Sequence, residues 1–124
     1  MKTLSIRQPC ASLIISGQKA IENRTWKTSY RGPLLVHATR WKTQAEFEAV
    51  ARFCARLGVE VPPQERLEHG GIIGTVDLTD IAQSSGNPWG IHGQYHWILE
   101  NPKPLAFIPA KGKLGLWDFI GEIA

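Results

Sequence analysis

The alternation of apolar and polar residues along the chain predicts several short strands. Such runs are rich in β-branched and aromatic residues and are bounded by glycine, proline or asparagine. They span residues 2–6, 20–26, 34–38, 71–78, 95–99 and 116–123. Residues 105–108 follow Pro102 and Pro104, so we expect an edge strand or an extended segment there, because proline cannot donate a hydrogen bond to a sheet.

Two further segments have the pattern of helices. The first opens at Pro9 and stops before Gly17, since proline suits the first helical turn and glycine ends helices. The second begins at Thr43, which forms a capping box with Glu46, and its apolar residues recur at helical spacing until Gly58. These elements predict an α+β fold: a small β-barrel of about six strands with two flanking helices. Periodicity alone does not separate this barrel from an open α+β sheet.

Composition is consistent with one globular domain over residues 1–124. The chain is 43% hydrophobic and 20% charged, which is typical of a folded domain. We find no apolar run of about 20 residues and no leader-like start, so we expect neither a membrane segment nor secretion. Cys10 and Cys54 are its two cysteines, and low cysteine content is typical of reducing compartments. We therefore expect a cytoplasmic protein.

Positive charge is concentrated in the first third of the chain. Residues 1–42 hold eight basic side chains and one acid, Glu22, a net formal charge of +7, whereas residues 43–124 have a net charge of −4. A basic segment of this kind favours an anionic partner such as a nucleic acid. Scattered, solvated surface charges would give the same counts.

Three segments together carry a family resemblance. They are LSIRQP at residues 4–9, GQKAIENRTW at 17–26 and YRGPLLVHA at 30–38. Their order and spacing resemble the ASCH domain, the activating-signal-cointegrator homology family of the PUA-like superfamily. The resemblance implies a PUA-like β-barrel with a cleft between the first helix and the barrel. It also implies that this cleft binds RNA or another single-stranded nucleic acid, or a free nucleoside or nucleotide.

Charged residues of this region are the first candidates for ligand binding. Arg7, Lys19 and Arg24 have the chemistry to hold phosphates. Glu22 and Arg24 are two apart on a predicted strand and face the same side, so Glu22 is placed to accept from an exocyclic amine of a base. A simple salt bridge between Glu22 and Arg24 is the structural alternative, and the two interpretations are compatible.

Gln8 and Trp26 complete the candidate binding residues. The amide of Gln8 both donates and accepts, as reading of a base edge requires, but it is equally suited to capping the first helix. Trp26 shares the predicted face of Glu22 and Arg24 and is the favoured stacking residue. Tyr30, Trp41 and Trp89 are also candidates for stacking, whereas Trp97 and Trp117 lie within predicted strands and are expected in the core.

An enzyme is the main alternative to a binding module. The resemblance extends to hydrolases that remove the acetyl group from N4-acetylcytidine and to proteins linked with ribonuclease action. In those hydrolases a lysine and a threonine of this segment are proposed as catalytic. Lys19 matches the lysine, and Glu22 stands at the threonine position. The loop that supplies a glutamate there corresponds to residues 82–93, which contain no acid. If the chain is an enzyme, Lys19 and Glu22 are its candidate catalytic residues.

Other classes of site have weaker support. His92 and His96 lie four apart but have no third ligand nearby and no helical context, so we expect neither a metal nor another cofactor. Cys10 lies at a helix start but has no catalytic partner in the sequence. The polar loop over residues 83–93 leaves open a third possibility, an adaptor that docks a protein partner. The sequence does not determine an oligomeric state.

Overall fold

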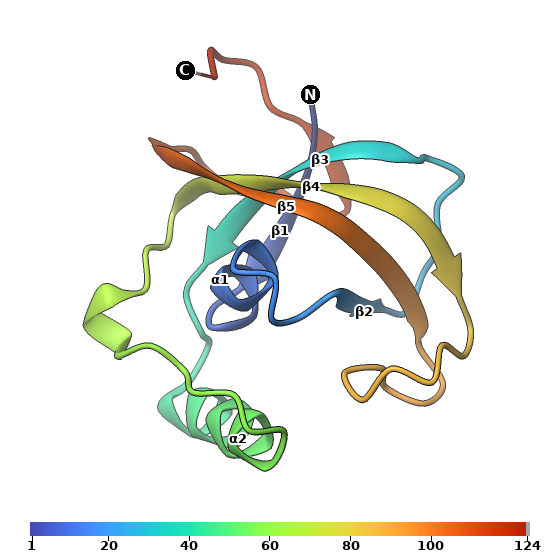
Figure 1. Ribbon diagram of the computed structural model, residues 1–124. Helices are drawn as coiled ribbons and strands as arrows, with labels where there is room; N and C mark the ends of the chain where they lie inside the picture. The colour runs from blue at the N-terminus through green and yellow to red at the C-terminus, as the bar shows by residue number, and fades with distance from the viewer. Residues whose placement is uncertain (124) are drawn as a thin grey trace.

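The computed structural model describes residues 1–123, which form six strands, two α-helices and one short 3-10 helix (Figure 1). The strands are β1 (Lys2–Arg7), β2 (Ile21–Arg24), β3 (Gly32–Thr39), β4 (Gly71–Ala82), β5 (Tyr95–Pro109) and β6 (Leu116–Asp118). The helices are α1 (Cys10–Ile15), α2 (Gln44–Arg56) and the 3-10 helix η1 (Gln64–Arg66). Within residues 1–123, no helix is both long enough and apolar enough to cross a membrane.

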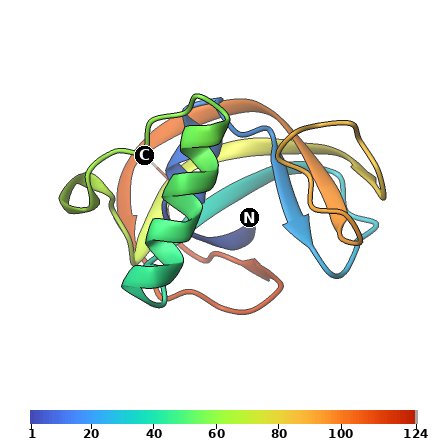
Figure 2. The ribbon, with the colours of Figure 1, turned by 90° about the horizontal axis from the view of Figure 1, so that it is seen from below.

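The strands form one curled sheet in the order β2-β5-β4-β3-β1-β6. β1 and β3 are parallel, and the other neighbouring pairs are antiparallel. The sheet curves over α1, so that β2 at one end comes round toward β1 near the other end (Figures 1 and 2). This half-barrel with two helices confirms the α+β fold class predicted from the sequence.

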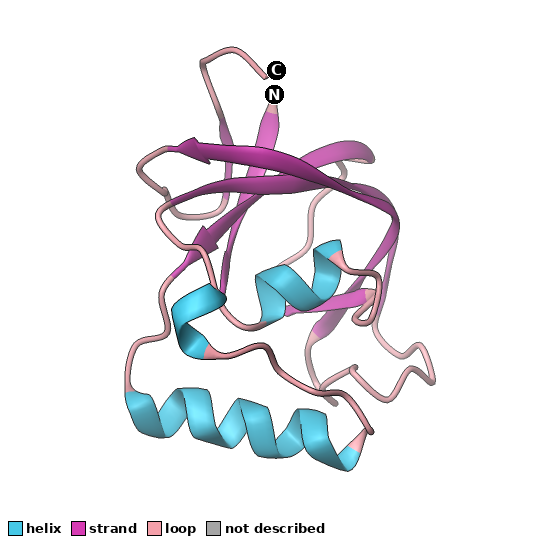
Figure 3. Ribbon diagram, turned by 60° about the vertical axis from the view of Figure 1, so that its left-hand side comes forward, coloured by secondary structure: helices cyan, strands magenta, loops and turns pink. Residues whose placement is uncertain are grey.

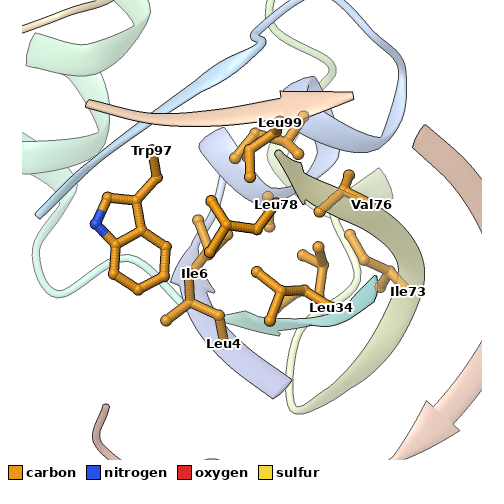
Figure 4. Close-up of a cluster of buried hydrophobic side chains, with 12 residues drawn as sticks. Leu4, Ile6, Leu34, Ile73, Val76, Leu78, Trp97 and Leu99 are labelled. Atoms are coloured by element: carbon orange, nitrogen blue, oxygen red, sulfur yellow. The ribbon is translucent and has the colours of Figure 1, made fainter. Parts of the chain in front are cut away.

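The main core lies between the concave face of the sheet and α1. Leu4, Leu34 and Leu78 from three strands and Ile14 from α1 are each 1% exposed, and Trp97 is fully buried (Figure 4). Burial of one such side chain contributes about 1.5–3 kcal/mol to stability. The short α1 is therefore held by packing rather than by its own helical propensity.

The longer helix, α2, lies outside the barrel and below α1 (Figure 3). A second, smaller apolar cluster joins it to the rest of the molecule, with Cys54 from α2, Leu13 from α1, Ile21 from β2 and Trp89. Thr43 is the N-cap, as predicted: its Oγ1 accepts from the Glu46 N–H at 3.1 Å, and Glu46 Oε2 in turn accepts from the Lys42 N–H at 2.7 Å. The sequence thus determined where α2 begins.

The largest difference from the sequence prediction concerns β5. It runs through Pro102 and Pro104 to Pro109 as a single strand of 15 residues. Two features make this possible. Asn101 adopts a positive φ of 53° at an irregularity in the β4–β5 register, and β2 pairs only with residues 95–98 of β5. The prolines therefore lie where β5 has β4 on one side and no strand on the other.

The ends of other strands also differ from the prediction. β4 continues to Ala82, β2 is limited to Ile21–Arg24, and β6 has three residues instead of the predicted eight. β6 lies at the edge of the sheet and ends at Asp118, opposite Lys2 at the start of β1. An edge strand extends only as far as it pairs with its neighbour. The sequence pattern of β6 alone does not reveal where its pairing with β1 ends.

The start of α2 generates a prediction about pH. The Lys42 backbone N–H, and with it the Arg7 guanidinium, lowers the pKa of Glu46. Because the pKa of Glu46 is lower in the folded than in the unfolded protein, Glu46 stabilises the fold fully at any pH above the ordinary pKa of a glutamate. This stabilisation is lost as pH falls through the lower folded value. We expect Glu46→Gln to lower Tm at neutral pH and to have less effect in acid, as measured by thermal denaturation over a pH series.

Glu48→Gln is the matched control, since Glu48 is exposed on the same helix. It should leave both the Tm and its pH dependence close to those of the unmodified protein. A Tm loss for Glu46→Gln that is the same at neutral and acid pH would contradict this account.

Candidate functional site

A cleft of about 880 Å³ opens between β1, β2, the end of β3 and the segment that joins β5 to β6. We call it the basic cleft. Its lining residues are Ser5, Arg7, Glu22, Asn23, Arg24, Thr25, Trp26, Thr39, Arg40, Lys42, Gln94, Gly112, Lys113 and Leu114. Among these described residues, five are basic and only Glu22 is acidic, so the cleft carries a strong excess of positive charge.

A second hollow, which we call the apolar recess, adjoins the basic cleft. It has a volume of about 430 Å³ and lies between α1, β2, α2 and the loop before β5. Its lining residues are Cys10, Lys19, Glu22, Asn23, Ala49, Val50, Phe53, Trp89, Ile91 and Gln94. Glu22, Asn23 and Gln94 line both hollows. The two spaces therefore meet at β2 and at the residue that precedes β5.

Glu22 is the centre of a buried ionic network at this junction. Its Oε1 lies 3.4 Å from Lys19 Nζ, and its Oε2 accepts from Arg24 Nε at 3.1 Å and from Arg24 Nη2 at 2.7 Å. Lys19 Nζ also donates to the Ile21 carbonyl. Glu22 and Lys19 are only 8% and 5% exposed. Both carboxylate oxygens are thus paired with cations at a largely buried position.

Arg24 extends this network across the opening of the half-barrel. Its Nη2 also donates to the Ser5 carbonyl on β1 at 2.7 Å. β1 and β2 are not hydrogen-bonded neighbours in the sheet. A guanidinium presents several donors in a fixed plane, so one side chain can bind a carboxylate and a carbonyl at once. Arg24 therefore links two strands that their backbones leave apart.

Lys19 lies in a different place from the one its sequence position suggested. The sequence made Lys19, Glu22 and Arg24 candidate binding residues of a single cleft, whereas Lys19 lines the apolar recess and is not part of the basic cleft. The reason is local: Lys19 precedes β2, and its ammonium turns inward to the Ile21 carbonyl and Glu22. Glu22, which faces both hollows, is the residue that brings the three together.

Arg7 and Trp26 both line the basic cleft. Arg7 is exposed, and its Nη1 donates to Glu46 Oε1 at 2.7 Å, which connects the cleft wall to the start of α2. Trp26 is half-buried, with its ring edge-on to Trp97 at a centroid distance of 4.8 Å. One side of Trp26 thus packs on the core while the residue still borders the cleft.

The side chain of Gln8 is engaged inside the protein. Its Oε1 accepts from the Ser12 backbone N–H at 2.9 Å, and its Nε2 donates to Ser12 Oγ and to the Glu68 carbonyl at 2.7 and 2.8 Å. Gln8 is 2% exposed. The structure therefore places it in the helix-capping role that the sequence left as its alternative.

The polar loop before β5 forms one wall of the apolar recess. Asn23 fixes it from β2, because Nδ2 donates to the Trp89 carbonyl at 2.9 Å and Oδ1 accepts from the Ile91 N–H at 2.8 Å. Trp89 in turn donates from Nε1 to the Gln18 carbonyl at 3.1 Å and packs against Phe53 of α2. Trp89 is buried, and its ring is part of the recess lining.

Other candidate chemistry has no clear support at this site. Burial raises the pKa of the Cys10 thiol, which disfavours the thiolate that a nucleophile requires. His96 is hydrogen-bonded to Ser85 Oγ and to the Ile91 carbonyl. In the part of the chain that the structure describes, no three histidine, cysteine or acidic side chains are grouped as metal ligands.

Comparison with known proteins identifies the family. The sequence profile of the ASCH domain matches residues 4–109. The chain belongs to the ASCH domain family. It is 31% identical to human activating signal cointegrator 1 and 30% identical to the mouse protein, in each case over 97% of this chain. It spans 22% of the length of those two relatives.

A solved ASCH structure supports the fold. The Y47F mutant of the ASCH protein from Zymomonas mobilis superimposes with a TM-score of 0.52, over 87% of this chain and 74% of the other. Sequence identity in that comparison is 15%, so the likeness is one of architecture. The half-barrel and its two helices are thus the ASCH fold.

The segment that carries the ASCH resemblance forms the junction between the two hollows. Residues 17–26 comprise the turn after α1 and the whole of β2, and they contribute Lys19, Glu22, Asn23, Arg24 and Trp26. Part of the sequence that carries the family resemblance thus lines both hollows of the candidate site.

Several lining residues were not singled out from the sequence. Arg40 and Lys42 belong to the basic segment over residues 1–42, so their charge was a usable signal. Gln94, Lys113 and Leu114 come from the second half of the chain, where no pattern marked them. They reach the site only because the sheet curls and brings the ends of β5 beside β1 and β2.

The ionic network predicts an order of stability losses. Glu22→Ala leaves the buried Lys19 and the half-buried Arg24 without their carboxylate, and removal of one partner of a buried pair costs about 3–5 kcal/mol. Lys19→Met should cost less, because Glu22 keeps both bonds from Arg24. Urea denaturation of the two variants measures the difference.

Asp118→Asn is the control, because it removes the exposed Lys2–Asp118 pair and should change stability by less than about 1 kcal/mol. If Glu22→Ala proves no less stable than Asp118→Asn, the network does not hold the site together.

Proposed function

We propose that this ASCH domain binds a single strand of nucleic acid, in the first place RNA, in the basic cleft, with one unstacked base in the apolar recess. The observation that carries the proposal is the junction at Glu22, Asn23 and Gln94, where a positively charged cleft opens into an apolar hollow. A polyanion whose repeating unit also carries a flat apolar ring matches both halves of this site.

The charge of the cleft favours a phosphate backbone. Arg7, Arg24, Arg40, Lys42 and Lys113 surround one acid, and that acid is already paired with Arg24. Arg7 is paired with Glu46, so Arg40, Lys42 and Lys113 are the basic groups most available to a ligand, and they neutralise phosphates with release of counterions. The resemblance to the ASCH family, generally thought to be RNA-related, points to the same class of ligand.

The apolar recess favours an unpaired base over a duplex. Its volume of about 430 Å³ lies within the range of small-ligand pockets, and its walls include Val50, Phe53 and Trp89. In a duplex the bases are stacked and paired, so a base enters such a pocket only from a single strand or after being flipped out.

The proposal gives each site residue a role. Trp26 offers a stacking face at the border of the cleft, and Glu22 accepts from an exocyclic amine of the base. Lys19 positions the Glu22 carboxylate, since its ammonium contacts Glu22 and the Ile21 carbonyl. We favour binding over hydrolysis because residues 82–93, which correspond to the loop that supplies a glutamate in the N4-acetylcytidine hydrolases, contain no acid.

Salt dependence tests the phosphate part of this proposal. Binding of a fluorescein-labelled oligouridylate, followed by anisotropy, should weaken with salt by a logarithmic slope of about −0.7 for each phosphate neutralised. The double variant Arg40→Ala, Lys42→Ala should bind more weakly and lose about one to two units of that slope. A flat salt response of the unmodified protein would overturn the proposal.

Arg52→Ala is the control for this series. It removes a positive charge from the exposed side of α2, away from the lining of both hollows. Its slope should match that of the unmodified protein, so that a general effect of net charge is separated from contacts in the cleft.

Steric blockage tests the recess. Ala49 is an exposed residue of α2 that lines it, so Ala49→Phe should fill the recess without disturbing the core. We expect cytidine monophosphate to shift the Trp89 indole N–H resonance in the unmodified protein and not in Ala49→Phe. Ala45→Phe, also exposed on α2 but outside the recess, should respond like the unmodified protein. Equal responses in all three proteins would exclude the recess as the base site.

A further inference from the structure

Leu114 is an apolar side chain held out at the rim of a charged cleft. It is 98% exposed and lines the basic cleft, on the segment between β5 and β6. Lys111 and Lys113 lie on the same segment, so the leucine has cationic neighbours in sequence. Nothing in the core or in either helix requires a leucine here, because its side chain has almost no contact with the protein.

The segment that carries Leu114 is anchored at its start. His37 Nε2 is hydrogen-bonded to the Ala110 carbonyl at 2.6 Å, and the Ala110 N–H donates to the Gly70 carbonyl at 3.1 Å. Gly112 lies so close to His37 that a Cβ at this position would be 2.8 Å from the ring. Glycine is therefore required at residue 112 for the segment to pack down on β1 and β3.

The far end of the segment is fixed as well. Gly115 adopts a φ of +68°, which favours glycine, and the chain then enters β6, whose Leu116 pairs with Leu4 of β1. Lys113 Nζ lies over the Trp117 ring at 5.9 Å from its centroid. Leu114 is thus presented by a short segment with both ends fastened. In Figure 2 this red segment lies across from the blue strand β2, which contributes Glu22 and Arg24 to the cleft.

We propose that Leu114 is a wedge that inserts beside a base of the strand bound in the basic cleft. This inference rests on the proposed function. Leucine is among the apolar side chains that enter between neighbouring bases and separate them. Unstacking a base costs a few kcal/mol, and contact of the leucine with the exposed base face offsets part of that cost. The separated base then has access to the apolar recess.

The charges around Leu114 favour nucleic acid over a protein partner. The basic cleft beside it is lined by Arg40, Lys42 and Lys113, and Lys111 adds a fourth positive charge on the same segment. An isolated apolar side chain in a cationic setting suits a ligand that combines negative phosphates with apolar base faces. A protein contact of Leu114 is the competing outcome of the test.

An oligoadenylate that carries one 2-aminopurine tests the wedge, because 2-aminopurine fluoresces more strongly when it is unstacked. The unmodified protein should raise the fluorescence on binding. Leu114→Ser should bind about 5- to 10-fold more weakly, with a smaller rise at saturation and an unchanged salt slope, since no charge is removed. Leu114→Phe should restore both affinity and fluorescence. The high exposure of Leu114 allows these variants to fold, which near-ultraviolet circular dichroism checks.

Ile120→Ser is the matched control. Ile120 is 95% exposed, similar in size and outside the lining of both hollows, so its loss should change neither signal. If Leu114→Ser binds and raises the fluorescence like the unmodified protein, the wedge is wrong while the basic cleft stands. If the unmodified protein does not bind the oligonucleotide, both proposals fail. A change of oligomeric state in Leu114→Ser with unchanged fluorescence would assign Leu114 to a protein contact instead.

Discussion

The buried carboxylate of Glu22 is the interaction on which the candidate site depends. It lies where three elements meet without backbone pairing to one another: the turn after α1, β2 and the adjacent β1. Lys19 and Arg24 bind its two oxygens, and Arg24 also donates a hydrogen bond to the Ser5 carbonyl. Burying a carboxylate costs desolvation free energy. Two cationic partners and their hydrogen bonds offset that cost better than a single partner does. The half-barrel is thereby closed at this point by side chains rather than by a seventh strand.

This arrangement has an electrostatic consequence for the surface. Because Glu22 is already paired with Lys19 and Arg24, it does little to offset the neighbouring positive charges of Arg40, Lys42 and Lys113, which remain in the cleft. The same residue also separates two environments, since the space on one side is bordered mainly by charged and polar residues and the space on the other mainly by apolar ones. A single acid thus organises a site with two chemically different halves.

The surroundings of the site are rigid at several points. Asn23 fastens the loop before β5 through two hydrogen bonds, and His37 fastens the segment after β5 through the Ala110 carbonyl. α2 is tied to β1 by the pair of Arg7 and Glu46. The ligand proposed above would meet walls whose positions are set in advance, which reduces the conformational entropy lost on binding. The side chains at the rim, Leu114 above all, are the parts that remain free to adapt.

The sequence by itself determined the local features. The capping box at Thr43 specified the start of α2, and the strand patterns specified most of the sheet. Three segments, one of them around Glu22, identified the family. Each of these depends on residues close together in the chain. The course of β5 through Pro102 and Pro104 was not predictable in this way, because it depends on β2 leaving that half of the strand unpaired.

Only the tertiary structure decided which residues share a cavity. Gln8 was turned inward to cap α1, Lys19 was placed in the recess behind Glu22, and Lys113 and Leu114 were brought to the cleft from the far end of the sequence. The physical reason is the curl of the sheet. It sets distances between strands that are remote in sequence, and hydrophobic periodicity records which face of a strand is buried but not which distant strand it will meet.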